Sequence, residues 1–145
     1  RFIDFDKKLY QPKTDIFSKD YYTNSFHIDV DSGLPGYKKI QLEGLFHEIC
    51  NGGCITYIEL GEAPLGNEES LEEYINIAVE AGVHYLGFNF PKDVCNDCGT
   101  TGVFDFCPKC KSKNITRIRR VSGYLEILDG FTKGKKAEEK NRRKN

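Results

Sequence analysis

The sequence contains no methionine, no long apolar run and almost no net charge. A natural reading frame starts with methionine, so we expect a chain of 145 residues that opens on Arg1 and lacks methionine to be a piece of a longer protein, and we interpret it as a C-terminal piece. No apolar run approaches the roughly 18 residues that a membrane-spanning helix needs, which excludes a transmembrane segment. The N-terminus also lacks the charged, apolar and small-residue pattern of a secretory signal. The apolar content of 39% is that of one ordinary globular domain.

The small net charge of −1 conceals two regions of opposite sign. Residues 109–145 carry 13 Lys and Arg against 4 Asp and Glu, whereas residues 1–108 carry 8 against 18. A basic tail can indicate nucleic-acid binding. A tail with charges of both signs, such as residues 134–145, is more often a solvated or docking helix.

Hydrophobic spacing and turn residues predict an α/β fold. The elements that we expect, in chain order, are a connecting segment over 1–20, a strand over 21–30, a helix over 37–50 closed by an αL cap at 51–53, a strand over 54–60, a helix that starts at a capping box of Ser70 and Glu73 and closes at Gly82, strands over 83–90 and 114–121, and a charged helix over 134–145. The middle strands and their helix form a plausible right-handed βαβ unit with parallel strands. Two parallel strands cannot cover themselves, so this unit needs more sheet from elsewhere.

Four of the six cysteines form two CxxC pairs, Cys95 with Cys98 and Cys107 with Cys110. With no secretory signal, this pattern favours metal binding in a reducing compartment, which we take to be the cytoplasm. Four thiolates suit a structural Zn²⁺ site, in which no position stays open for a catalytic water. Two disulfides and an iron–sulfur cluster are the alternatives, and the paired short spacing favours zinc over both.

The other cysteines and the histidines show no ligand spacing. Cys50 and Cys54 stand four positions apart and are either buried apolar side chains or a reactive pair, with packing favoured. We interpret His27, His47 and His84 as structural, hydrogen-bonding histidines.

A β-branched run ends at Ser122 and Gly123, a step that by itself predicts only a loop. Its setting, after the cysteine pairs and before the charged tail, makes it specific. The sequence resembles anaerobic (class III) ribonucleotide reductases over roughly residues 20–143. The segments that carry the resemblance are YYTNSFH (21–27), EICNGGCITYIELG (48–61), AGVHYLGFNFP (81–91), the CxxC pairs, RRVSGYL (119–125) and FTKGKKAEEKNRR (131–143).

The resemblance implies an α/β fold that forms the C-terminal part of a ten-stranded glycyl-radical-enzyme barrel. Residues 1–91 would be its last strands and helices, 92–113 a small zinc-ribbon module with four cysteine ligands, 114–130 a strand and the radical loop, and 131–145 a charged tail. Gly123 would carry a stable Cα radical, with Ser122 and Tyr124 shaping the loop. A separate iron–sulfur activase that uses S-adenosylmethionine would install this radical.

In the complete enzyme, which the resemblance implies is a homodimer, the glycyl radical would oxidise a cysteine thiol, and the thiyl radical would attack the ribose of the ribonucleotide substrate. Formate or a thiol system would supply the reducing equivalents. The thiyl cysteine and the nucleotide-binding regions lie upstream in the family and are absent from this sequence, so we expect the chain alone to be inactive.

Two other functions remain open at this point. The chain could be a zinc-ribbon binding module whose basic tail contacts nucleic acid or protein, although its first two-thirds are acidic and few aromatics lie among the basic residues. It could also be a glycyl-radical subunit of a different radical enzyme, which would explain the cysteine pairs less well.

Overall fold

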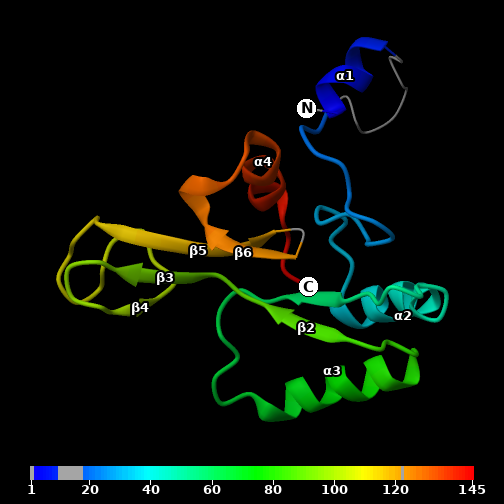
Figure 1. Ribbon diagram of the computed structural model, residues 1–145. Helices are drawn as coiled ribbons and strands as arrows, with labels where there is room; N and C mark the ends of the chain where they lie inside the picture. The colour runs from blue at the N-terminus through cyan, green and yellow to red at the C-terminus, as the bar shows by residue number, and fades with distance from the viewer. Residues whose placement is uncertain (1, 10–17, 122) are drawn as a thin grey trace.

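The computed structural model describes residues 2–9, 18–121 and 123–145 and has a mixed α/β architecture (Figure 1). The elements in chain order are α1 (Phe2–Leu9), α2 (Gly36–His47), β1 (Thr56–Glu59), α3 (Glu68–Glu80), β2 (Leu86–Asn89), β3 (Lys92–Cys95), β4 (Thr101–Gly102), β5 (Ile115–Val121), β6 (Tyr124–Ile127), the 3-10 helix η2 (Leu128–Gly130) and α4 (Lys133–Asn141). Among the described residues, no helix has the length and apolar character needed to cross a membrane.

The expected βαβ unit is present. β1 and β2 pair in parallel, with Thr56 opposite Leu86 and Glu59 opposite Asn89, and α3 connects them. Figure 1 shows α3 running along the β2 side of this pair. Ile40, Ile58 and Ala78 form the buried core between the strands and helices α2 and α3. In the described residues this sheet has only two strands, which agrees with the expectation that further strands come from elsewhere.

A second, antiparallel sheet has the strand order β4-β3-β5-β6. The strand predicted over 114–121 is confirmed as β5, which lies in the centre of this sheet. It pairs with β3 along its first half and with β6 along its second half. Strand β6 was not expected, because its four residues follow directly on a turn and all are exposed.

The N-terminal expectations were wrong in two places. Phe2–Leu9 is helical where we expected a connecting segment, since its apolar residues recur at helical spacing and Ile3 is buried. No strand forms over residues 21–30. The backbone N–H of Ile28 donates instead to the carboxylate of Glu43, at 2.9 Å, so a side chain of α2 replaces a strand partner.

Both central helices differ from the prediction at one end. α2 ends at His47, before the expected αL cap at 51–53. α3 begins at Glu68 behind Asn67, so Ser70 and Glu73 lie inside the helix rather than forming a capping box. The closure of α3 near Gly82 is confirmed, because the helix ends at Glu80 and Gly82 has a positive φ.

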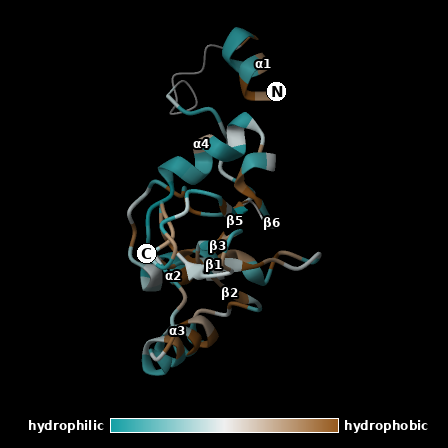
Figure 2. Ribbon diagram, turned by 90° about the vertical axis from the view of Figure 1, so that its left-hand side faces the viewer, coloured by the Kyte–Doolittle hydropathy of each residue, from teal (hydrophilic) through white to brown (hydrophobic). Residues whose placement is uncertain are grey.

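The charged C-terminal tail is helical over Lys133–Asn141, so the helix predicted over 134–145 is confirmed except for its last four residues, and the tail docks on its own chain. Figure 2 shows that α4 is hydrophilic along most of its length. After α4 the backbone N–H of Asn145 donates to the carbonyl of Glu59, and that of Arg143 donates to the carbonyl of Val30, both at 2.9 Å. The end of the tail thus contacts Glu59, the last residue of β1, which lies 86 positions earlier in the sequence.

Candidate functional site

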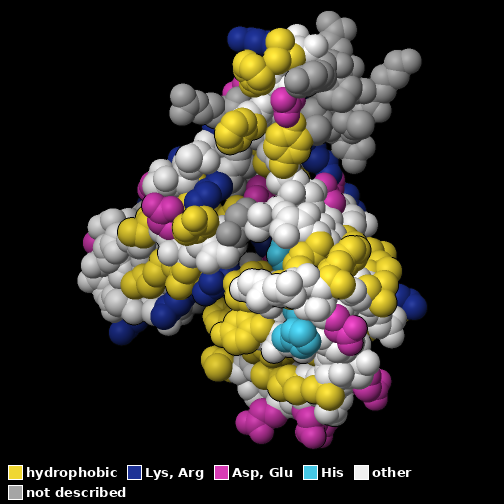
Figure 3. All heavy atoms as spheres, turned by 45° about the vertical axis from the view of Figure 1, so that its right-hand side comes forward, with side chains coloured by type: hydrophobic (Ala, Val, Ile, Leu, Met, Phe, Trp, Pro, Cys, Tyr) yellow, Lys and Arg dark blue, Asp and Glu magenta, His cyan; other side chains and the backbone are white. Residues whose placement is uncertain are grey.

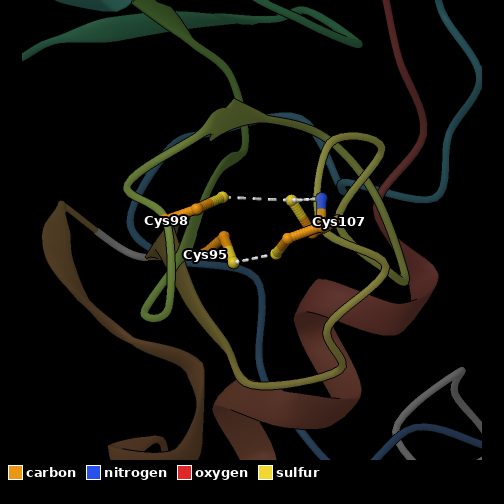
Figure 4. A group of neighbouring side chains, drawn as sticks. Cys95, Cys98 and Cys107 are labelled. Atoms are coloured by element: carbon orange, nitrogen blue, oxygen red, sulfur yellow. Dashed lines mark hydrogen bonds between the residues drawn. The ribbon is translucent and has the colours of Figure 1, made fainter.

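The two CxxC pairs meet in space. The ligand atoms of Cys95, Cys98, Cys107 and Cys110 all lie within 4.8 Å of one another, and this cluster could hold a metal ion. Figure 4 shows the side chains of Cys95, Cys98 and Cys107 converging on a common point. The sulfurs of Cys95 and Cys110 are 3.5 Å apart, as are those of Cys98 and Cys107. A tetrahedron of four Zn–S bonds of about 2.3 Å has edges of about 3.8 Å, so the cluster has the size that zinc requires.

Each CxxC pair is a tight turn closed by backbone hydrogen bonds. The N–H of Gly99 donates to the carbonyl of Cys95, and the N–H of Lys111 donates to the carbonyl of Cys107, both at 2.9 Å. The N–H of Cys110 also points at the sulfur of Cys107, at 3.5 Å. The two turns therefore repeat one design, which explains why four cysteines separated by up to 15 positions converge.

The electrostatics of the cluster differ from one sulfur to the next. The backbone N–H of Cys110 is the main reason why the pKa of Cys107 falls to about 6. The pKa of Cys110 instead rises to about 12: the N–H of Ser112 lowers it, but the neighbouring sulfurs raise it by more. Cys95 and Cys107 are buried, whereas Cys110 is exposed, so the cluster opens to solvent on one side.

Strand β5 leads from this cluster to Gly123. At one end Ile115 pairs with Cys95, and at the other Val121 pairs with Tyr124, with Gly123 at the turn between them. Gly123 is exposed and has φ of +83°, a backbone conformation that residues with a Cβ rarely adopt. The expected loop is thus the tip of a β-hairpin. Ser122 lies outside the described residues.

Gly123 borders a cavity whose wall includes Tyr57, Asn89 and Arg120. Nη1 of Arg120 donates to the carbonyl oxygen of Gly123 at 3.3 Å. The next residue, Tyr124, is exposed, and Nζ of Lys135 lies 4.1 Å from the centre of its ring. The sequence of residues 119–125 predicts a functional role for this stretch, but it contains no signal that links the stretch to Tyr57.

Cys50, Cys54 and His47 have surroundings that favour a structural role. Cys50 and Cys54 are half-buried, and burial, followed by the thiol of Cys50, raises the pKa of Cys54. A thiol kept protonated is a poor nucleophile, which favours the packing interpretation. His47 is buried and hydrogen-bonds to Oγ1 of Thr56 at 2.9 Å, while its Nδ1 accepts the backbone N–H of His84.

The basic tail is engaged with the chain's own carboxylates. Arg142 forms ion pairs with Glu59 and Glu138, and Arg143 pairs with Asp31 at 2.7 Å. These pairs do not favour a tail that is free to bind nucleic acid.

The sequence and the fold are those of a known class of proteins. A family profile described as anaerobic ribonucleoside-triphosphate reductase matches residues 1–145. The anaerobic ribonucleoside-triphosphate reductase of Escherichia coli K12 is 37% identical over 98% of this chain and 21% of its own length. That of enterobacteria phage T4 is 34% identical over 95% of this chain and 24% of its own length.

Solved structures agree. A structure of an anaerobic ribonucleotide reductase superposes with a TM-score of 0.77 at 25% identity, over 99% of this chain and 22% of that one. The Thermotoga maritima anaerobic ribonucleotide reductase in complex with dATP and CTP shares the fold, with a TM-score of 0.69 at 23% identity, over 94% of this chain and 21% of that one.

The chain belongs to the anaerobic ribonucleoside-triphosphate reductase family. It spans about a fifth of the length of the curated relatives that it matches.

Proposed function

We propose that the chain is the glycyl-radical-bearing C-terminal region of an oxygen-sensitive anaerobic ribonucleotide reductase. The complete enzyme makes deoxyribonucleotides from ribonucleoside triphosphates for DNA synthesis in the cytoplasm. One observation carries this proposal: Gly123, within the sequence RVSGYL, lies at the tip of a hairpin and has a positive φ. In this proposal Ser122 and Tyr124 shape the radical loop.

Glycine suits radical storage for a chemical reason. The amide nitrogen on one side of its Cα and the carbonyl on the other delocalise an unpaired electron, and the absence of a side chain lets the centre become planar. One hydrogen atom leaves the Cα of Gly123 and passes to the acceptor that a partner activase derives from S-adenosylmethionine. In the complete enzyme the glycyl radical then takes a hydrogen atom from a cysteine thiol, and the resulting thiyl radical attacks the ribose.

Zinc is the metal that we assign to the cysteine cluster, with Cys95, Cys98, Cys107 and Cys110 as its ligands. The size of the cluster and its all-sulfur donor set support zinc over a hard cation that prefers oxygen ligands. Bound zinc would be structural, because four sulfurs fill its coordination shell. It would tie the end of β3, at Cys95, to the turn that precedes β5 and so support the strand that leads to Gly123. In this division of the chain, residues 92–113 are the zinc module, 114–130 the radical hairpin and 131–145 the tail.

Residues 1–91 are, in this proposal, the last elements of a ten-stranded barrel whose other strands come from the rest of a reductase, which works as a homodimer. Exposed apolar side chains support this assignment. Figure 3 shows hydrophobic side chains gathered on the side of the molecule that carries α2. Those of α2 and the turn after it that are at least 40% exposed are Tyr37, Leu42, Leu45, Phe46 and Ile49. An apolar surface of this kind typically marks an interface.

The test is anaerobic activation with the activase, S-adenosylmethionine and a reductant, followed by electron paramagnetic resonance. We expect a doublet signal, and on exposure to air cleavage of the backbone at Gly123 into one large and one small piece. The chain is measured alone and then combined with the rest of a reductase barrel. No signal in either case would refute the proposal.

The matched control is Gly123→Ala. A Cβ at this position meets no atom within 4 Å, so the variant should fold, with strain only from the positive φ. It should give neither the doublet nor the cleavage, because the added Cβ hinders a planar centre. A radical signal that persists in this variant would show that the radical is stored elsewhere.

A further inference from the structure

Arg120 is held between an aromatic ring and the backbone of Gly123. Its guanidinium carbon lies 5.6 Å from the centre of the Tyr57 ring. Its Nη1 donates to the carbonyl oxygen of Gly123 at 3.3 Å. A cation over a ring face and a hydrogen bond from the same group restrict the guanidinium from two sides.

A glycine in the neighbouring strand makes room for the Tyr57 ring. Tyr57 and Gly87 are directly opposite in the parallel pair β1 and β2. A Cβ on Gly87 would lie only 2.7 Å from a carbon of that ring. Because Gly87 has no Cβ, the ring can lie close against β2, where Arg120 reaches it.

The two consecutive arginines of β5 have different partners. Arg119 forms ion pairs with Asp93 at 2.7 Å and with Glu139 at 3.4 Å. Arg120 forms no ion pair with any carboxylate in the described part of the chain. Its main-chain carbonyl accepts the side-chain amide of Asn89 at 3.4 Å, which links its backbone to β2. Within the described residues, the guanidinium of Arg120 therefore contacts the Tyr57 ring and the Gly123 carbonyl.

We propose that Arg120, seated on the Tyr57 ring that Gly87 accommodates, is a positioning residue for the Gly123 radical. This inference rests on the proposed function of Gly123. The carbonyl of Gly123 is one of the two groups that share the unpaired electron. A cationic donor at its oxygen draws spin density from the Cα onto the carbonyl and fixes the orientation of that peptide group. Arg120 thereby sets both the ease with which the radical forms and the distribution of its spin.

The test compares Arg120→Met with wild type in the chain combined with the rest of a reductase barrel, after anaerobic activation. We expect the radical yield to fall roughly two- to tenfold, the effect of losing one hydrogen bond. The splitting of the doublet should also widen, because more spin stays on the Cα. A loss of folding alone would lower the yield but would not change the splitting.

Three further variants separate this role from general damage. Arg120→Lys keeps a cationic donor and should restore most of the yield. Tyr57→Leu removes the ring and should widen the splitting in the same direction as Arg120→Met. Arg117→Met is the matched control. Arg117 lies on the same strand, and its ion pair in the described part of the chain is with the exposed Asp105, so the signal of this variant should equal that of wild type.

The outcomes distinguish the two proposals. A wild-type doublet together with an unchanged yield and splitting in Arg120→Met would overturn the role of Arg120 and leave that of Gly123 intact. A wild type without any doublet would overturn both. A changed splitting in Arg120→Met that Arg120→Lys reverses would establish the positioning role.

Discussion

Arg142 is expected to contribute more to stability than any other cation of the tail. Its guanidinium contacts Glu59 and pairs with Glu138 at 2.9 Å and with Glu139 at 3.4 Å. Its side chain is 13% exposed, and that of Glu59 is 6% exposed. In Arg142→Met these carboxylates would stay largely buried without their shared cation, which is far more costly than losing a surface pair.

The size of the effect follows from that burial. Removing one partner of a buried pair costs about 3–5 kcal/mol, and the residual exposure of Arg142 places it near the lower end, at about 3 kcal/mol. For a chain of this length each kcal/mol shifts the melting temperature by about 2–4 °C, so we expect a fall of about 6–12 °C. Thermal and urea unfolding at pH 7, followed by circular dichroism, measure both quantities.

Arg143→Met is the matched control on the adjacent residue. The side chain of Arg143 is 62% exposed in its pair with Asp31, and such exposed pairs contribute about 0–1 kcal/mol. Equal losses in the two variants, or a loss below about 1 kcal/mol in Arg142→Met, would refute the reasoning. The double variant Arg142→Met with Glu59→Gln should be less destabilised than the sum of the two single variants, since it removes a buried charge together with its partner.

Three further predictions concern the core, a histidine and the metal. Ile58→Ala should cost about 2–5 kcal/mol in urea unfolding because Ile58 is fully buried, while Leu65→Ala, 91% exposed in wild type, should change stability by less than about 0.5 kcal/mol. Burial lowers the pKa of His47 below its ordinary 6.5, so the neutral ring contributes stability above that pH. The free energy of unfolding should therefore decrease as pH falls below 6.5. A His47→Gln variant whose free energy of unfolding changes equally with pH between 7.5 and 5.5 would contradict this. Cys107→Ser should lose bound zinc, measured by atomic absorption, and should show faster hydrogen exchange along β3 and β5. The control Cys50→Ser should keep its zinc. Equal zinc content in the two variants would contradict the assignment.

The sequence predicted the parts of the fold that depend on local patterns. α2 and α3 follow from apolar spacing, and the cysteine cluster from two tight turns of equal design. The strand expected over residues 21–30 failed because a carboxylate 15 positions later, that of Glu43, takes the N–H of Ile28. A strand pattern is read over four to eight residues, a window too short to include that partner.

The same limit applied to the candidate site. The importance of Gly123 could be inferred from its neighbours in the sequence, but its contact with Arg120, which lies on Tyr57 opposite Gly87, depends on three strands that pack together only in the folded chain. The docking of the tail depends likewise on the pair between Arg142 and Glu59, 83 positions apart. Contacts of this range carry no signal in a single sequence.

The register of β5 gives the cysteine cluster an influence beyond its own surroundings. Side chains alternate between the faces of a strand, so a slip of one residue against β3 would move each of the two arginines to the opposite face of the sheet. Arg119 would then face the Tyr57 ring, and Arg120 would turn toward the acidic groups on the opposite face. In the register that is adopted, Cys95 of the cysteine cluster lies opposite Ile115, at the start of β5. Any change at the cluster that shifted this pairing would therefore also change, at the far end of the strand, which arginine reaches the hairpin tip.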